Sequence, residues 1–535
     1  MIQVPRRKFL AGASLAFLPA YVSSAFARPL EAFDIRDYGA KGNGAALDTA
    51  AIQRAIDAAS AAGGGTVYLP TGRFLSFTIQ LKSHVTVLFG SGAVLIAADP
   101  AKHGGSYDLP EANAWDPYQD FGHSYFRNSL LWGEDLEDIA IMGPGLIDGE
   151  GLTNISPNAP WSVGITRDLP ASPELEARIA SHYADVKAMN GKGNKAIALK
   201  NSRNVTIRDV SILRGGHFGI LATGVDNLTI DNMKIDTNRD GIDLDVVRNA
   251  RLSNLSINSP TDDAIVLKSS LALGVARPTE NVTITNCHVS GYDVGSLLDG
   301  TYRKSQLKNI ELHLTSGRIK LGTETNGGFR NIAVSNCVFD CCNGLAIESV
   351  DGGVLEDVVV NNIVMRDTTA APIFLRLGDR RRAPPGTPIA VLRRVTISDV
   401  DCHSLDKRYC SSIVGVPGAS VEDVTLSGIR LIYQGGGTAA NAALKLPEVE
   451  GKYPDPDMFG VMPAWGLYMR HVRGVVLRDV ELTALSADAR PPVVTEDVTG
   501  LITDGLLAAS GRGTPLQPVR LSRPRKHARR RRRRH

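Results

Sequence analysis

The stretch NVTIRDVSI, residues 204–212, decides the fold because its nine-residue pattern recurs along the chain. Its second, fourth, seventh and ninth positions are apolar. Similar stretches begin at Asn227, Asn249, Asn281 and Asn331, a degenerate one begins at Asn309, and later ones are centred on Val358, Val395, Val424 and Val475. A pattern that returns at intervals above about 20 residues is typical of a solenoid, in which each coil buries its inner face against its neighbours.

The strands predicted from this repeat are short and parallel. Alternation of apolar and polar residues, then a break, then renewed alternation indicates two strands with a bend between them. β-Branched residues are frequent in the copies, and helical periodicity is nearly absent. We therefore predict an all-β chain that folds as a right-handed parallel β-helix of about ten coils. The Asn that opens each copy either joins a hydrogen-bonded ladder or reflects turn propensity alone, and the sequence leaves both interpretations open.

One short helix is predicted before the coils. Asp48 is placed to cap it, and Ile52, Ala55, Ile56 and Ala59 share one face. The glycines at 63–65 end it. We expect this helix to cover the N-terminal end of the solenoid, where an open coil would expose apolar edge.

Composition and charge exclude several classes of protein. The chain is 43% hydrophobic and 21% charged, which suits a large core. No apolar run reaches the roughly 18 residues that span a bilayer, so an integral membrane protein is excluded. The net charge is +3, but residues 520–535 carry ten Lys and Arg and the first 27 residues carry three, so residues 28–519 carry −10. An acidic body argues against nucleic-acid binding.

The two ends are predicted to lie outside the folded domain, which we place at residues 28–515. Residues 1–27 combine an Arg pair at 6–7, a short apolar region and a small-residue cleavage site, and resemble a twin-arginine signal peptide, with an ordinary export signal as the alternative. A periplasmic or secreted protein is expected. Residues 516–535 are predicted to be a basic disordered tail, serving either as an anchor for an anionic surface or as a solvated end.

Two insertions, residues 101–195 and 433–470, interrupt the repeat and are expected to form the walls of a groove. The aromatic residues of the first either stack on sugar rings or pack locally; they are Trp115, Tyr118, Phe121, Tyr125, Phe126, Trp132 and Trp161. Six cysteines are too few to build a disulfide framework in so long a chain. Cys287 and Cys337 fall on inward positions, whereas the pairs Cys341–Cys342 and Cys402–Cys410 are open to oxidation.

Three acidic residues lie at matching positions of two neighbouring coils. Asp240 lies five residues after the last apolar position of its copy, and Asp262 does the same in the next copy, followed by Asp263. Because stacked strands are about 4.8 Å apart, these carboxylates should form one cluster. Mutual repulsion raises at least one pKa, which separates an acid from a base as glycoside hydrolysis requires. A calcium site or solvated turn acids are the alternatives.

Two cations follow on a later coil. Arg318 and Lys320 point to the same side of a predicted strand, because side chains alternate along it. Cations near an acid cluster suit an anionic substrate, and a pair of solvated strand charges is the alternative.

With this acid cluster and these cations, the chain resembles glycoside hydrolase family 28, the polygalacturonases, from about Phe33 to Leu482. FDIRDYGAKG at 33–42, Asp48-Thr49, GRF at 72–74 and GLIDG at 145–149 resemble its N-terminal landmarks. NRD at 238–240, TDD at 261–263 and RIK at 318–320 resemble its Asn-Thr-Asp, Gly-Asp-Asp and Arg-Ile-Lys motifs. One landmark departs, since the family's Gly-His-Gly is replaced by SGYDV at 290–294, with Tyr292 nearest to the His.

The resemblance implies hydrolysis of α-linked galacturonate, or a related pectic sugar, by single displacement with inversion. It implies Asp262 as general acid, with Asp240 and Asp263 positioning and deprotonating the water. Arg318, Lys320 and Tyr292 would bind the substrate. We interpret His217 and Asp243 as structural residues.

Further expectations complete this interpretation. The two insertions predict exo action, because they would block one end of the groove. We expect neither metal nor cofactor, a pectic poly- or oligosaccharide as the partner, and a monomer. Two other classes remain as alternatives: a β-helix pectate lyase with a calcium cage and an arginine base, and a non-catalytic carbohydrate-binding β-helix.

Overall fold

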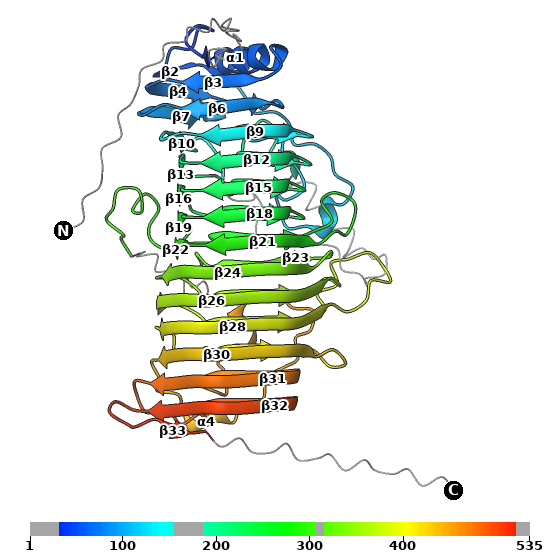
Figure 1. Cartoon of the computed structure of the whole chain (residues 1–535), viewed down its shortest axis with the longest axis vertical. Coiled ribbons are helices and arrows are strands. Elements are labelled where there is room, and N and C mark those ends of the chain that lie inside the picture. The colour runs from blue at the N-terminus through cyan, green and yellow to red at the C-terminus, as the bar shows by residue number, and fades with distance from the viewer. Residues whose placement is uncertain (1–31, 155–185, 305–314, 520–535) are drawn as a thin grey trace, which may run out of the picture. The chain divides into compact units, whose positions relative to one another are not determined.

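The computed structural model describes residues 32–154, 186–304 and 315–519. Strands of this part stack in chain order as a parallel β-helix, which confirms the predicted fold (Figure 1). The predicted signal peptide, Trp161, the degenerate copy at Asn309 and residues 520–535 lie outside the described residues. The boundaries predicted for the folded domain stay a prediction, although β33 (Gln517–Pro518) pairs antiparallel with β32 (Val493–Ser510).

Each regular coil consists of three strands that belong to three parallel sheets. In one coil these are β14 (Phe218–Thr223), β15 (Asp226–Asp231) and β16 (Lys234–Asp236). The next coil, from β17 to β19, pairs with it in register, with Ile220 opposite Ile242 and Ile235 opposite Ile257. The copies predicted from the sequence therefore cover the second and third strands of each coil.

The first, second and third sheets follow the order of the three strands in a coil. The first sheet contains β5 (Ile79–Gln80), β8 (Leu131–Glu134), β11 (Lys195–Lys200), β14, β17 (Asp240–Asp245), β20 (Ile265–Ser269), β23 (Ile319–Thr325), β25 (Leu345–Ser349), β27 (Ile373–Leu377), β29 (Ser411–Val414) and the starts of β31 (Leu467–Ala484) and β32. The second contains β1 (Ala32–Asp34), β3 (Gly65–Leu69), β6 (Val85–Phe89), β9 (Glu137–Met142), β12 (Arg203–Arg208), β15, β18 (Arg248–Ser253) and β21 (Thr279–Thr285). The third contains β2 (Asn43–Leu47), β4 (Gly72–Ser76), β7 (Ala93–Ala97), β10 (Leu146–Asp148), β13 (Ser211–Leu213), β16, β19 (Ser256–Asn258) and β22 (His288–Ser290). Long strands then serve both of the last two sheets: β24 (Phe329–Asp340), β26 (Val354–Thr368), β28 (Val391–Ser404), β30 (Val421–Tyr433), β31 and β32.

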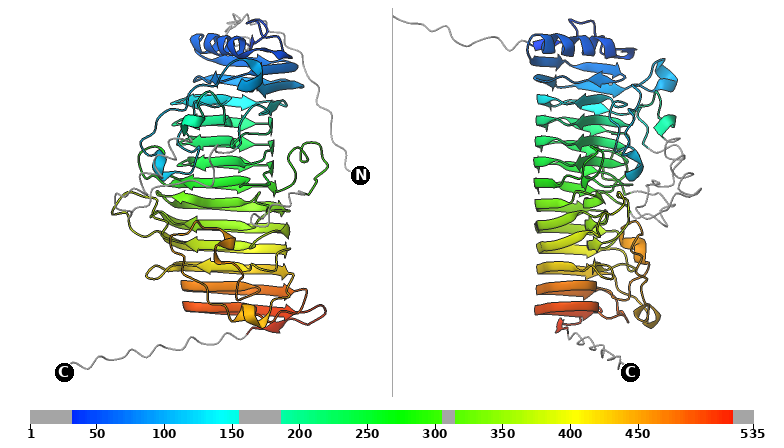
Figure 2. Two further views of the ribbon diagram at one scale, coloured as in Figure 1. Left: turned by 180° about the vertical axis from the view of Figure 1, so that it is seen from behind. Right: turned by 90° about the vertical axis from the view of Figure 1, so that its right-hand side faces the viewer.

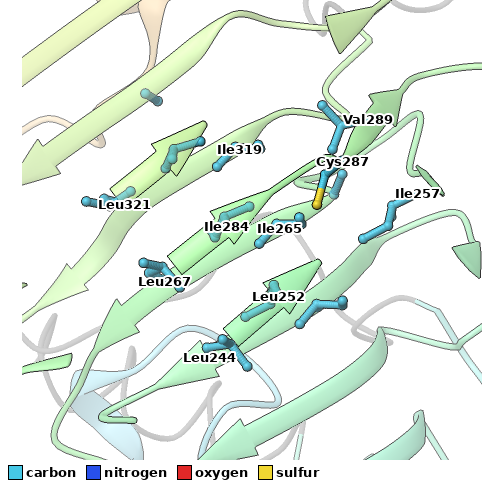
Figure 3. Close-up of a cluster of buried hydrophobic side chains, with 14 of the residues drawn as sticks. Leu244, Leu252, Ile257, Ile265, Leu267, Ile284, Cys287, Val289, Ile319 and Leu321 are labelled. Carbon is cyan, nitrogen blue, oxygen red and sulfur yellow. The ribbon is translucent and has the colours of Figure 1, made fainter. Parts of the chain in front are cut away.

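The core is a column of apolar side chains inside the coils. Leu244, Ile265 and Ile319 come from successive strands of the first sheet, and Leu252 and Ile284 face them from the second (Figure 3). The repeat predicts these positions because only its alternating residues point inward. Cys287 and Cys337 lie in this core as predicted. Among the described residues, the remaining cysteines are also buried free thiols, so neither pair is oxidised in this structure.

The recurring asparagines serve both functions that the sequence left open. Asn204, Asn227 and Asn281 have φ of 55°, 57° and 58°, in the left-handed region that Asn tolerates better than most residues. Their side chains also bond from coil to coil: Asn227 Nδ2 donates to Asn204 Oδ1 at 2.7 Å, and Asn281 Nδ2 donates to Asn249 Oδ1 at 3.0 Å. The asparagine thus fixes the backbone bend and links neighbouring coils.

Helix α1 (Thr49–Ala61) covers the N-terminal end of the stack, as expected (Figure 1). Its buried face is formed by Ala51, Ile52, Ala55, Ile56 and Ala59. The predicted side-chain cap is wrong, because the carboxylate of Asp48 accepts the backbone N–H groups of Lys41 and Gly42 at 2.6 and 3.0 Å instead. Asp48 therefore ties the preceding loop to the helix start. Among the described residues, no helix is long and apolar enough to cross a membrane.

The predicted bounds of the first insertion are wrong, because residues 131–148 within it form a regular coil, β8 to β10, that pairs with the next coil. The described residues on either side of this coil, and those of the second insertion before β31, lie on the side of the first sheet (Figure 2). They include the short helices α2 (Pro100–His103) and α4 (Ala439–Ala442) and the 3₁₀ turns Asp116–Tyr118 and Pro456–Phe459. Of the aromatic residues, Phe121, Tyr125, Phe126 and Trp132 are buried, which favours local packing. Trp115 and Tyr118 are half-buried, with ring centroids 5.9 Å apart.

Candidate active site

The predicted acid cluster forms at the turn between the third and first sheets. Asp240 begins β17, and Asp262 and Asp263 precede β20. Oxygens of the three carboxylates lie within 4.8 Å of one another. The backbone of Asp263 lies beside Asp240, because its N–H donates to Asp240 Oδ1 at 3.2 Å and Gly241 N–H donates to its carbonyl at 3.0 Å. Stacking of matching coil positions therefore brings the three acids together.

Asp263 is the acid that two cations hold in the ionised form. Arg318 Nε donates to its Oδ1 at 2.8 Å, and Lys320 Nζ lies 3.3 Å from its Oδ2. Burial alone would raise the pKa of Asp263, but the charges of Lys320 and Arg318 outweigh burial and lower it far below its ordinary value. Asp263 is therefore ionised near neutral pH, cannot donate a proton, and is a weaker base than an ordinary carboxylate.

Asp262 is the most accessible of the three acids. Its side chain is 24% exposed, against 4% for Asp263, and it forms an ion pair with Arg239. Asp240 is buried, and desolvation together with the charges of Asp243 and Asp262 raises its pKa well above the ordinary value. The cluster thus contains carboxyl groups of different proton affinity, as acid–base catalysis requires.

Arg318 and Lys320 lie beside the cluster, but they are more engaged than the sequence suggested. Both are buried, and residues of the second insertion bind them: Arg318 Nη2 donates to Asp455 Oδ2 at 3.0 Å, and Lys320 Nζ donates to the hydroxyl of Tyr453 at 3.4 Å. Among the described residues, Arg318 Nη1 is buried without a hydrogen-bond partner. That group is unpaired but closed to solvent, so an anion reaches it only if the second insertion moves.

Tyr292 does not direct its hydroxyl at the acids. The hydroxyl donates to Asp340 Oδ2 at 2.8 Å, and Arg366 holds the same carboxylate. Its assignment to substrate binding stays a prediction. His217 packs edge-on against Phe121 and Phe218, which agrees with its interpretation as a structural residue.

Sequence reasoning missed several members of the site. Asp243, interpreted as structural, lies in the cluster, and His123 Nε2 is 3.1 Å from its Oδ2. Lys268 Nζ is 4.0 Å from the same oxygen and 3.0 Å from Glu324 Oε2. Strand alternation places Asp243 outward with Arg318 and Lys320, and this signal could have found it. No repeat signal marks His123, which lies in the first insertion.

Two groups of side chains have the donor types of a metal site. His123, Asp240 and Asp243 form one, and Asp240, Asp262 and Asp263 form the other. Cations already neutralise both groups: Arg239, Lys268, Arg318 and Lys320. This positive charge opposes binding of a metal ion.

Glu348, on β25, is a buried carboxyl beneath Lys320. Its two oxygens have no hydrogen-bond partner among the described residues, and Lys320 Nζ is 3.9 Å away. Burial raises its pKa to about 7, and the nearby cations offset burial only in part. The folded protein therefore binds a proton here that an unfolded chain would release.

Glu348→Gln is expected to remove a pH dependence of stability. A raised carboxyl pKa gives a contribution that is complete below the ordinary value of 4.5 and is lost as pH rises through 7. The variant should match the wild type near pH 4.5 and be more stable at pH 8 by up to about 3 kcal/mol, measured by unfolding at both pH values. Glu356→Gln is the control of opposite sign, because Arg393 and Arg394 lower the pKa of Glu356 despite its burial. Equal stability of Glu348→Gln and wild type at pH 8 would contradict the assignment.

The fold and the acid cluster define a parallel β-helix protein with a carboxylate site on its first sheet. Two family models match the chain: one described as rhamnogalacturonase A/epimerase, pectate lyase-like, over residues 32–114, and one described as right-handed β-helix region, over residues 195–374. An exo-poly-α-D-galacturonosidase of Dickeya chrysanthemi is 24% identical over 424 residues, which are 73% of this chain and 65% of the relative. A probable polygalacturonase of Vitis vinifera is 24% identical over 62% of this chain and 60% of its own length.

Solved structures agree on the fold. The family 28 exopolygalacturonase of Yersinia enterocolitica has a TM-score of 0.63 at 20% identity, covering 89% of this chain and 78% of that one. The exopolygalacturonase of Thermotoga maritima has a TM-score of 0.57 at 19% identity, covering 84% and 92%. The curated relatives bear out the resemblance to polygalacturonases, and the solved structures share the β-helix fold. The chain spans slightly less than two thirds of the length of these curated relatives.

Proposed function

We propose that this protein is a glycoside hydrolase that cleaves α-linked galacturonate or a related pectic sugar. The cluster of Asp240, Asp262 and Asp263 carries the proposal, because it combines an accessible carboxyl with one held ionised by cations. Relatives named as polygalacturonases support the substrate class. The unpaired Arg318 Nη1 supports an anionic sugar, since it can donate to a carboxylate once movement of Asp455 in the second insertion gives access to it.

The geometry supports distinct roles for the three acids. Asp262, the most exposed, protonates the leaving oxygen. Asp263, held ionised by Arg318 and Lys320, accepts a hydrogen bond from the attacking water and positions it. Asp240, once ionised, is the stronger base and takes the proton, so its raised pKa should set the acidic limb of the pH profile.

Inversion is expected from the resemblance, and the product should appear first as the β-anomer. One oxygen of each carboxylate lies within 4.8 Å of the others, a closest atom-to-atom approach and not the separation between carboxyl groups, which is roughly 6.5–9.5 Å in inverting glycosidases. Geometry therefore does not support inversion by itself, and proton NMR of fresh product, before mutarotation, decides. Initial α-anomer would show retention. EDTA sensitivity with an unsaturated product would instead show a lyase, and binding without reducing sugar would show a non-catalytic protein.

Exo action is proposed because both insertions close over the first sheet beside the acids. Asp120 of the first pairs with Arg382, in the turn that follows β27, and Tyr453 of the second accepts a bond from Thr323 at 2.9 Å. These two segments would obstruct a long polymer that extends along the first sheet. The viscosity of a pectic polymer should fall slowly relative to the release of reducing ends, and a rapid early fall would contradict exo action.

The remaining proposals follow from the sequence. We propose export by a twin-arginine-type signal, a periplasmic or secreted location, and a monomeric state. Short oligosaccharides would then be the substrates that an exo-acting enzyme meets. Fractionation of a producing cell, with the mature N-terminus determined, tests the location.

A further inference from the structure

A histidine of the first insertion approaches the acid cluster from the side of Asp243. The imidazole of His123 is almost fully buried, and its Nε2 lies 3.1 Å from Asp243 Oδ2. One donor atom from each of His123, Asp240 and Asp243 lies within 4.8 Å of the others. The pair is thus in electrostatic reach of Asp240, and the roles proposed for Asp240, Asp262 and Asp263 do not use it.

The hydrogen-bond partners of His123 determine where its protons lie. Nδ1 is 3.0 Å from the carbonyl oxygen of Asp120, which can only accept, so Nδ1 carries a hydrogen. A neutral ring would then present a lone pair to the carboxylate of Asp243, and the two would repel. A second proton must therefore lie between Nε2 and Oδ2. The pair holds it either as imidazolium with carboxylate or as imidazole with carboxylic acid.

The surroundings of the pair are charged on several sides. Burial and Lys268 lower the pKa of His123, but the hydrogen bond to Asp243 and the charge of Glu324 outweigh them and raise it. Burial raises the pKa of Asp243, and His123 and Lys268 offset burial only in part. The ring of Phe218 packs edge-on against the imidazole of His123, with ring centroids 4.8 Å apart. The charged and titratable groups around the pair lie on or before the neighbouring strands: Lys268 on β20, Asp262 before it, Glu324 on β23, Asp240 and Asp245 on β17, Arg239 before it, and His217 before β14.

We propose that His123 and Asp243 are positioning residues that keep Asp240 ionised at the working pH. This inference rests on the proposed function, in which Asp240 acts as a carboxylate. The shared proton makes the pair neutral as a whole, so it offsets the charge by which the carboxylate of Asp243 raises the pKa of Asp240. The pair then adds no net charge to that of Asp262 and Asp263, which also lie within 4.8 Å of Asp240. Without the imidazole, Asp240 and Asp243 would share one proton, and the second ionisation would occur at higher pH.

The test is the pH dependence of kcat/KM for an oligogalacturonate in wild type, His123→Gln and Asp243→Asn. Gln can donate to Asp243 but cannot carry charge, so the acidic limb should move up by about one pH unit or more. Asp243→Asn leaves no second carboxylate for the imidazole to neutralise, so the limb should not move up. His84→Gln is the matched control, because His84 pairs with Glu137 and Asp138 on the second sheet. A purely structural role of His123 would lower activity or stability without moving the limb, and that result would overturn the proposal.

A second measurement needs no activity. The free energy of unfolding is measured across pH for wild type and His123→Gln, each with and without Asp240→Asn. The difference that Asp240→Asn makes changes at the pH where Asp240 ionises. That pH should be higher in the His123→Gln background than in wild type. If the wild type is inactive but Asp240 still ionises at higher pH in His123→Gln, the proposed function is refuted and the role of His123 and Asp243 is supported. If the wild type is active but the ionisation pH of Asp240 is the same in His123→Gln, the proposed function is supported and the role of His123 and Asp243 is refuted.

Discussion

Asp262→Asn should abolish most of the hydrolysis while leaving the fold intact. Asn has nearly the same shape but cannot donate the proton that the leaving oxygen needs, and loss of such help costs about 10²–10⁴-fold in rate. Asp240→Asn should lose a similar factor if Asp240 acts as a carboxylate. The measurement is kcat/KM for release of reducing sugar from a pectic oligosaccharide.

Two controls separate chemistry from folding. Asp57→Asn replaces an exposed acid on α1, far from the acid cluster in the coil order, and should leave activity unchanged. Asp262→Asn should still unfold in one cooperative transition, with a midpoint lowered by loss of the ion pair with Arg239. Full activity in folded Asp262→Asn would refute its role as the acid.

Arg318→Ala is expected to lose about ten- to a hundred-fold in kcat/KM. A charge-assisted contact is worth about 1.5–3 kcal/mol, and Arg318 provides one to Asp263 and can provide another to the sugar carboxylate through Nη1. Arg318→Lys should also be impaired, because an ammonium group cannot reproduce the forked contacts to Asp263 and Asp455.

Substrate charge separates the two contributions of Arg318. Methyl-esterified or reduced sugars lack the carboxylate, so wild type should discriminate against them and Arg318→Ala should discriminate less. Arg394→Ala is the control, since Arg394 pairs with Glu356 and Asp357 on the second sheet. Equal discrimination by wild type and Arg318→Ala would mean that Arg318 serves only to keep Asp263 ionised.

The location of the three acids could be predicted from the sequence because it depends on the repeat. Ile235 and Ile257 end matching copies, and the structure pairs them in register. Asp240 and Asp263 therefore had to lie near each other once the coils stacked. The alternation of Arg318 and Lys320 likewise placed both on the outer side of β23.

The protonation states of these acids could not be predicted, because they depend on partners from distant segments. His123, Tyr453 and Asp455 come from insertions that have no period, so no pattern relates them to a coil. The helix cap predicted at Asp48 was wrong for the same reason, because the backbone N–H groups of Lys41 and Gly42 in the preceding loop bind its carboxylate.

The sequence by itself determined the β-helix, its inward residues and the meeting of the acids, because a short repeat with alternating side chains admits one way to bury its apolar face. The tertiary structure alone decided which cation holds which carboxylate and where an imidazole approaches. Those contacts join residues more than a hundred positions apart, such as His123 with Asp243 and Arg318 with Asp455. Their energies depend on burial and distance, which exist only after the coils stack and the insertions close over them.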